Sequence, residues 1–99
     1  MDPEMKKLLH ALKQVPEGKV TTYKILAEHL GWHPRKVARM LSKNPFPLIF
    51  PCHRVVCSDG RIGGYTPHDS DTKARILEVE GVPVKGGKIQ DFQKYLHEF

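Results

Sequence analysis

The pattern of apolar and polar residues predicts an amphipathic helix at the start of the chain. Apolar residues there recur at i, i+3, i+4 and i+7, which places them on one face of a helix. They are Met5, Leu8, Leu9 and Leu12. The helix should end near Pro16-Glu17-Gly18, which interrupts the pattern, and Val20 then indicates a short extended stretch.

A second helix is predicted directly after this stretch. Thr21 or Thr22 can cap its first turn, and Gly31 should end it. Four residues share its inward face: Tyr23, Leu26, Ala27 and Leu30. This helix is short, and a turn must follow at once.

A third, basic helix begins at Pro34, a residue suited to the first helical position, with Val37 and Leu41 inward. Its basic residues are expected to face largely outward: Arg35, Lys36, Arg39 and Lys43. The prolines after Asn44 stop it, because proline disfavours helical dihedrals in the preceding residue. Helix, short turn and basic helix form a helix-turn-helix pattern.

The second half of the chain predicts minor β structure and two helices. Val55-Val56 and Arg61-Ile62 flank a turn that contains Asp59-Gly60, which is typical of a hairpin and suggests a small wing. A helix over residues 72–80 follows a polar loop at 66–71. Val84 and Ile89 suggest a second hairpin, and a short helix should occupy residues 91–98. The expected fold is mainly α with minor β, winged-helix-like, in one domain over residues 1–99.

The distribution of charge narrows the range of possible functions, because the segment 29–58 carries the whole net charge of +5. Residues 29–58 contain five basic residues and no acidic one, whereas the rest of the chain is balanced. Such a patch is typical of a protein that binds a phosphate backbone, although a solvated basic face has the same composition. With no apolar run of membrane-spanning length and no signal-like start, we expect a soluble protein of the cytoplasm or nucleus.

Cys52 is the main candidate for chemistry. His53 follows it directly and can take the thiol proton or orient a water molecule that does so. The cationic, acid-free window should favour the thiolate, and Glu80 could orient the histidine. The alternative is that Cys52 is a small buried residue without reactivity.

The remaining cysteine and the histidines predict no metal site and no disulfide. Cys52, His53 and Cys57 lack the second ligand pair of a structural zinc site. Two cysteines only five positions apart make a poor disulfide framework, so both should stay reduced, with Cys57 as a packing residue. No cofactor is expected.

These residues carry a resemblance to a known family. From Val20 to Gly81 the chain resembles the DNA-binding, active-site domain of the O6-alkylguanine-DNA alkyltransferases, also called methylated-DNA-protein-cysteine methyltransferases. The matching elements are Thr22-Tyr23-x2-Leu26-Ala27, Arg35-x-Val37, Asn44-Pro45, Pro51-Cys52-His53-Arg54-Val55, Asp59-Gly60, Gly63-Gly64-Tyr65 and Lys73 through Glu80-Gly81.

The resemblance implies a DNA repair protein that is consumed in a single turnover. Cys52 would attack the alkyl carbon on guanine O6 and keep the group as a thioether. His53 and Glu80 would activate the thiol through a bound water, Tyr23 would press on the target nucleotide and assist the leaving guanine, and Asn44 would brace the link from the basic helix to Cys52.

The same resemblance implies how duplex DNA would be held. The target base must flip out of the stack, and Arg35 matches the finger that fills its place from the minor groove. Lys36, Arg39 and Lys43 would contact DNA. Backbone groups of Cys52, Val55 and Thr66, next to Tyr65, would read the flipped base. The protein is expected to act as a monomer.

Three differences from the family leave an alternative open. The separate N-terminal domain common in the family is expected to be missing, and the length matches alkyltransferase-like proteins. Those proteins bind alkylated guanine without repairing it. They typically carry Trp or Ala at the position of Cys52. The bulk of Lys36, Arg39 and Met40 should loosen the approach to the minor groove or exchange it for phosphate attraction. The loop at 66–70 also differs. A lesion-binding protein is therefore the second hypothesis, and a transcription regulator that reads the major groove is the third.

Overall fold

The computed structural model describes residues 2–44, 49–63 and 70–99, and three helices occupy the first part of the chain. Helix α1 (Pro3–Gln14) begins where the Asp2 side chain accepts a hydrogen bond from the amide of Glu4 at 2.8 Å. Its predicted apolar face is buried, with Leu8 and Leu12 fully inaccessible to solvent. The helix ends two residues before Pro16, close to the predicted position.

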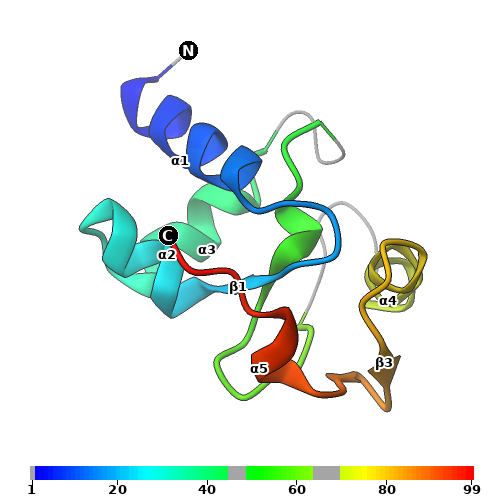
Figure 1. Ribbon diagram of the computed structural model, residues 1–99. Coiled ribbons are helices and arrows are strands. Elements are labelled where there is room, and N and C mark those ends of the chain that lie inside the picture. Colours follow the sequence, from blue (N-terminus) through cyan, green and yellow to red (C-terminus); the bar gives the residue numbers. More distant parts are fainter. Residues whose placement is uncertain (1, 45–48, 64–69) are drawn as a thin grey trace.

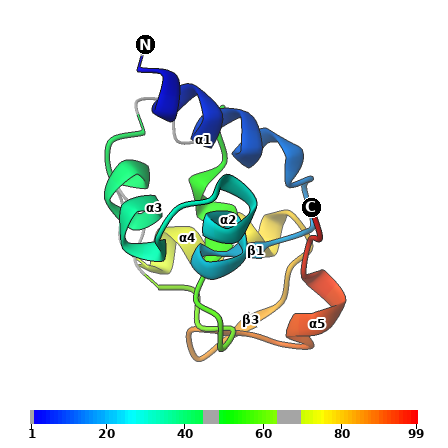
Figure 2. The ribbon, with the colours of Figure 1, turned by 90° about the vertical axis from the view of Figure 1, so that its left-hand side faces the viewer.

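Helices α2 (Tyr23–Leu30) and α3 (Pro34–Leu41) form the predicted helix-turn-helix. Thr22 caps α2 through a 3.0 Å hydrogen bond from the amide of Ile25 to its hydroxyl. Gly31 ends α2 with a φ of +75°, a left-handed conformation that glycine adopts without a steric penalty. The His33 ring accepts the amide of Arg35 and so caps α3, whose core contacts include the fully buried Val37. Figure 2 shows α2 and α3 together below α1.

One strand pairing differs from the prediction. Strand β1 (Thr21–Thr22) pairs in parallel with β2 (Val55–Val56), with Thr21 opposite Val55. The predicted hairpin between Val55-Val56 and Arg61-Ile62 is therefore wrong. The turn does form, since Cys57 N–H donates to the Arg61 carbonyl at 2.8 Å. Parallel pairing lets both valines of β2 become fully buried, which a two-stranded wing on the surface would not.

The last third of the chain completes the fold. Helix α4 (Ser70–Val79) precedes a hairpin of β3 (Val84–Lys85) and β4 (Lys88–Ile89), which confirms the second predicted hairpin. Helix α5 (Phe92–Tyr95) is shorter than predicted. The chain leaves it because His97 N–H bonds to the Val20 carbonyl at 2.7 Å, so the tail runs extended beside β1. None of the described helices is long and apolar enough to cross a membrane.

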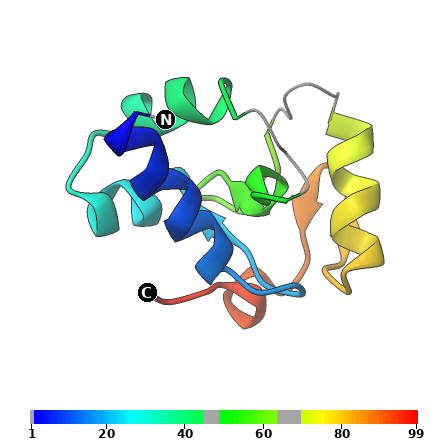
Figure 3. The ribbon, with the colours of Figure 1, turned by 90° about the horizontal axis from the view of Figure 1, so that it is seen from above.

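Two hydrophobic clusters meet at β2. Helices α1, α2 and α3 bury one cluster, which includes Cys52 and Val55. The other cluster contains Val20, Val56 and Leu77 and lies between β2, α4 and the β3–β4 hairpin. The short 3-10 helix η1 (Cys52–Arg54) therefore lies between the three N-terminal helices and α4, as Figures 1 and 3 show. This seam holds the candidate active site.

Candidate active site

Cys52 opens η1 and is almost fully buried, with 7% of its surface exposed. Its amide donates a 2.8 Å hydrogen bond to the carbonyl of Phe50, and Nδ2 of Asn44 donates to the same oxygen at 2.8 Å. Asn44 lies three residues beyond the end of α3. Its side chain thus connects the basic helix to the segment that carries the thiol, as the sequence predicts.

The environment of Cys52 corrects one expectation. Burial raises the pKa of the thiol, and this outweighs a hydrogen bond from Asn44, the charge of Lys73 and a backbone hydrogen bond, all of which lower it. The absence of acidic residues from positions 29–58 predicts a lowered thiol pKa instead, because that argument considers charge without burial. Cys52 is therefore a neutral thiol at rest, and nucleophilic attack requires a proton acceptor.

His53 and Glu80 form that type of pair, as predicted across 27 positions of sequence. Nε2 of His53 lies 3.0 Å from Oε1 of Glu80, and the two side chains are only 2% and 8% exposed. Burial lowers the pKa of His53, and the hydrogen bond and charge of Glu80, which raise it, offset this only in part. The imidazole is therefore neutral near pH 7 and able to accept a proton.

Arg54 completes this group, although the sequence offered it only as one charge of the basic window. Its Nε and Nη2 atoms bond to Oε1 and Oε2 of Glu80 at 3.0 and 2.5 Å, and Nη1 donates to the Val15 carbonyl at 2.8 Å. Burial raises the pKa of Glu80, but hydrogen bonds from Arg54 and His53 outweigh it and leave the pKa lowered. Glu80 is thus ionised, with Arg54 as its counterion.

Lys73 is a second residue of the site that the sequence did not assign. Only 1% of it is exposed, and its Nζ donates a 2.7 Å hydrogen bond to the Val55 carbonyl. Burial lowers its pKa to about 8, against smaller opposite effects of the Cys52 and Cys57 thiols. A signal was available: Lys73 shares the i, i+3, i+4, i+7 face of α4 with Ile76, Leu77 and Glu80.

Tyr23 and Cys57 border the same region. Burial raises the pKa of the Tyr23 hydroxyl, and the charges of Cys57 and Cys52 raise it further, which places the phenol near both thiols. A Cβ at Gly63 would lie 3.4 Å from the Cys57 sulfur and 4.0 Å from the Tyr23 oxygen. These are ordinary contact distances, and it is the left-handed backbone, with a φ of +70°, that favours glycine at this position. Cys57 is partly exposed and, like Cys52, a free thiol.

The predicted DNA-contacting residues divide into two groups. Arg35, Arg39 and Lys43 are exposed along and just beyond α3. Lys36 is not freely outward: it forms an ion pair with Glu4 of α1, and its Nζ lies 4.6 Å from the centre of the Trp32 ring.

Met40 also departs from the expectation for the basic helix. It is 8% exposed and belongs to the core cluster, so its bulk does not face outward. Ala38, a small residue, lies on the exposed face instead. The expected obstruction of the minor groove by Met40 is therefore wrong.

The predicted substrate-binding residues are only partly described. Val55 is fully buried, and its carbonyl already accepts the Lys73 ammonium. The Cys52 carbonyl accepts the amide of Val55. A carbonyl oxygen has two lone pairs and can accept more than one hydrogen bond. Tyr65 and Thr66 lie outside the described residues.

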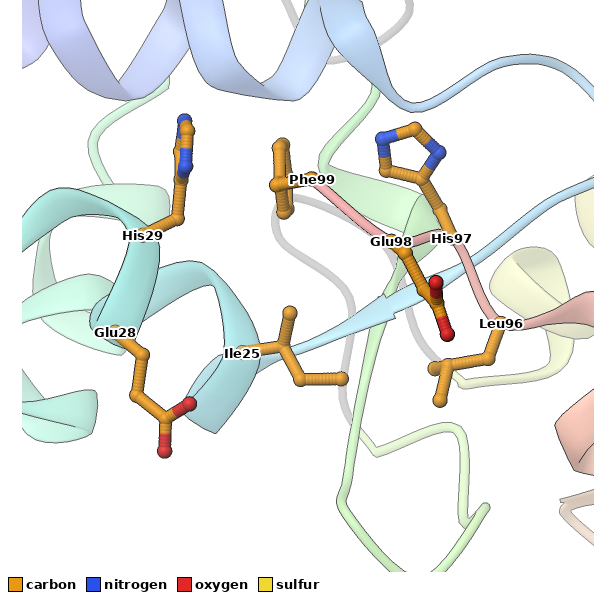
Figure 4. Close-up of a pocket in the computed structure, with 7 residues that line it drawn as sticks. All are labelled: Ile25, Glu28, His29, Leu96, His97, Glu98 and Phe99. Atoms are coloured by element: carbon orange, nitrogen blue, oxygen red, sulfur yellow. The ribbon is translucent and has the colours of Figure 1, made fainter.

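Other surfaces do not resemble a reaction centre. Over residues 2–44, 49–63 and 70–99, no three His, Cys, Asp or Glu side chains are placed to hold a metal ion. A hollow of about 430 Å³ lies between α2 and the C-terminal tail, where Phe99 stacks on His29 with ring centres 4.2 Å apart (Figure 4). It contains none of the predicted site residues.

Sequence comparison gives this arrangement a context. Residues 3–82 match the profile of the family described as "6-O-methylguanine DNA methyltransferase, DNA binding domain". The chain is 44% identical over 81 residues to a methylated-DNA–protein-cysteine methyltransferase of Methanothermobacter thermautotrophicus, covering 82% of this chain and 46% of that protein. The chain thus spans about half the length of the curated relatives it matches.

Solved structures share the fold. The crystal structure of the O6-methylguanine-DNA methyltransferase of Pyrococcus kodakaraensis superposes with a TM-score of 0.77 at 43% identity, over 83% of this chain and 48% of that one. Atl1 of S. pombe, solved with damaged DNA containing O6-carboxymethylguanine, gives a TM-score of 0.83 at 28% identity, over 100% of this chain and 98% of that one. These likenesses confirm the predicted mainly α, helix-turn-helix class.

Proposed function

The chain belongs to the family of the 6-O-methylguanine DNA methyltransferase DNA-binding domain, and from this premise we propose that it repairs DNA by taking an alkyl group from guanine O6 onto Cys52. The matched segment contains Cys52, His53 and Glu80, so we propose that this DNA-binding domain also holds the active site. The reaction is a single turnover, because the thioether formed on sulfur is stable and the nucleophile is used up.

The observation that carries this proposal is the buried series of Cys52, neutral His53 and ionised Glu80. A buried thiol with a raised pKa needs a base, and a neutral imidazole oriented by a carboxylate is a suitable one. His53 would accept the thiol proton through a water molecule. The Glu80 carboxylate would stabilise the imidazolium that forms, without taking the proton itself.

The transfer step conserves atoms and charge. The Cys52 sulfur forms a bond to the alkyl carbon while the bond from that carbon to guanine O6 breaks. The electron pair of the broken bond stays with the guanine, which gains one proton and returns to its normal form. Tyr23, which borders the thiols, would assist this departure as a proton donor.

Duplex DNA is the proposed partner, bound through its minor groove. A carbon on O6 is inaccessible in a stacked duplex, so the base must be flipped toward the seam that holds Cys52. Arg35, exposed at the start of α3, would fill the vacated position, while Arg39 and Lys43 would contact phosphates. The backbone carbonyls of Cys52 and Val55 would accept hydrogen bonds from the flipped base.

Lesion binding without repair is the second candidate. The observation in its favour is the likeness to Atl1, which extends over the whole of this chain and nearly all of that one. The presence of Cys52, with His53 and Glu80 in hydrogen-bonding contact, favours the transfer reaction.

A stoichiometric repair assay separates the two candidates. The protein is incubated with excess duplex containing one O6-methylguanine, and the lesion that remains is counted after digestion to nucleosides. We expect at most one lesion removed per chain, and none with Cys52→Ala at unchanged lesion-selective binding. Selective binding by both proteins with every lesion intact would replace alkyl transfer with lesion sensing.

A further inference from the structure

Arg54 follows His53 directly, and the hydrogen bonds of its side chain go to two segments outside α3. Its guanidinium spans the gap between two segments: Nη1 holds the Val15 carbonyl after α1, and Nε and Nη2 hold Glu80 after α4. Only 16% of its side chain is exposed. A basic residue used in this way is not available to a DNA phosphate, so its charge has another purpose.

The two oxygens of Glu80 are divided between their donors. Oε1 lies 3.0 Å from both Nε2 of His53 and Nε of Arg54, while Oε2 lies 2.5 Å from Nη2 of Arg54. A guanidinium that holds both oxygens fixes the plane of a carboxylate, which one imidazole nitrogen cannot do. Glu80 lies in the turn directly after α4, and its amide bonds to the Ile76 carbonyl at 3.1 Å, so its backbone is held by the helix end while Arg54 holds its carboxylate.

We propose that Arg54 is a positioning residue: it fixes the Glu80 carboxylate so that one oxygen faces His53, and it balances the carboxylate charge so that His53 is neutral before the reaction. The proposal rests on the alkyl-transfer function and deepens it. It explains how a buried carboxylate can orient the imidazole while the imidazole stays unprotonated at rest.

The charges around His53 support this assignment. Glu80 favours the imidazolium, whereas Arg54 from the same segment and Lys73 from α4 disfavour it, and burial adds to their effect. Removing Arg54 leaves only Lys73 and burial to oppose the effect of the Glu80 charge on His53. The imidazole should then take up a proton at a higher pH than in the parent protein, and while protonated it cannot accept the proton of Cys52.

Two substitutions separate charge from geometry. Arg54→Met removes both, and Arg54→Lys keeps the charge but cannot hold both oxygens in one plane. Arg61→Met is the matched control, because Arg61 also holds a carboxylate, with Nε 2.7 Å from Oδ2 of Asp59, but on the exposed surface. Two quantities are measured: the single-turnover rate of alkyl transfer against pH, and the NMR titration of the His53 ring in the DNA-free protein.

For Arg54→Met we expect the acid limb of the rate profile and the His53 titration to move together to higher pH by about one unit. At a pH below the midpoint, this shift lowers the fraction of neutral imidazole about tenfold. Arg54→Lys should keep the wild-type midpoint with a lower rate at every pH. Arg61→Met should change neither quantity.

An unmoved His53 titration in Arg54→Met, with the rate lowered by the same factor at every pH, would reduce Arg54 to a structural role and overturn the proposal. A wild-type rate in Arg54→Lys would overturn its positioning part, and this variant serves if Arg54→Met does not fold. Absence of alkyl transfer by the parent protein would refute the proposed function instead, while the NMR titration would still decide whether Arg54 keeps His53 neutral.

Discussion

Lys73→Met should change how the stability of the protein depends on pH. Lys73 is 1% exposed, and its ammonium donates a 2.7 Å hydrogen bond to the Val55 carbonyl. Burial lowers its pKa from 10.5 to about 8. The folded protein therefore binds this proton less tightly than the unfolded chain, and folding becomes more favourable as pH rises from about 8 toward 10.5.

The magnitude follows from the size of this interval. Each pH unit between the folded and unfolded pKa values adds about 1.4 kcal/mol to the free energy of unfolding. From neutral pH to about pH 9.5, some 1.5 units above the folded pKa, the gain is about 2 kcal/mol. Methionine has a similar length and no charge, so the variant lacks this gain. Because Lys73→Met also loses the hydrogen bond to the Val55 carbonyl, its free energy of unfolding should be lower by about 1–3 kcal/mol at every pH.

The assay is urea unfolding followed by circular dichroism, under reducing conditions, at several pH values between neutral and about 9.5. Other groups titrate in this range, including Cys52 and Tyr23, so the informative quantity is the difference between the parent protein and Lys73→Met. That difference should grow with pH by about 2 kcal/mol. Lys24→Met, at an exposed position of α2, is the matched control and should leave the difference flat.

A constant difference between the parent protein and Lys73→Met across the pH range would refute this reasoning. It would mean that Lys73 keeps its ordinary pKa and is hydrated in solution. A difference that shrinks with pH would mean that the folded protein binds the proton more tightly, and would assign Lys73 a strong anionic partner.

Three further predictions concern the basic helix and its neighbour. Arg35→Ala should slow lesion processing more than it weakens overall binding, measured by single-turnover rates and fluorescence anisotropy, and equal losses would contradict a finger role. Lys43→Ala should reduce the slope of log binding constant against log salt concentration by roughly one unit. Lys36→Ala should reduce this slope less, because Glu4 already pairs with Lys36. Equal changes in the two variants would argue against that ion pair in the DNA complex. Thr22→Ala removes the cap of α2 and should cost about 1 kcal/mol in thermal unfolding, and an unchanged melting temperature would show the cap to be replaced by water.

Local signals explain how much of the fold could be predicted. Apolar spacing in α1 and α2 and the caps at Thr22, Gly31 and Pro34 act within a few residues, so helix positions follow from the sequence. The pairing of Thr21-Thr22 with Val55-Val56 does not, because parallel strands are joined by a long connection without a local signature. The sequence predicts the turn at Asp59-Gly60, but a turn signal does not show which strand pairs with Val55-Val56.

The site was predictable where chemistry follows residue type. The sequence predicts Cys52, His53 and Glu80 as nucleophile, base and orienting acid, and the structure brings the last two within 3.0 Å, while their roles stay predictions. Composition assigns basic residues to the surface and so does not single out Arg54 or Lys73. Packing partly buries Arg54 against Glu80, and it buries Lys73, whose ammonium bonds to the Val55 carbonyl. The pKa of Cys52 was misjudged for the same reason, since charge is visible in a sequence and burial is not.

The location of the transferred group tests the central claim most directly. After incubation with duplex DNA containing O6-methylguanine, the protein is digested and its cysteine peptides are examined by mass spectrometry. We predict one methyl group per chain, on the sulfur of Cys52 and absent from the partly exposed Cys57. An unmodified Cys52 after long incubation with tightly bound, lesion-containing DNA would contradict the account.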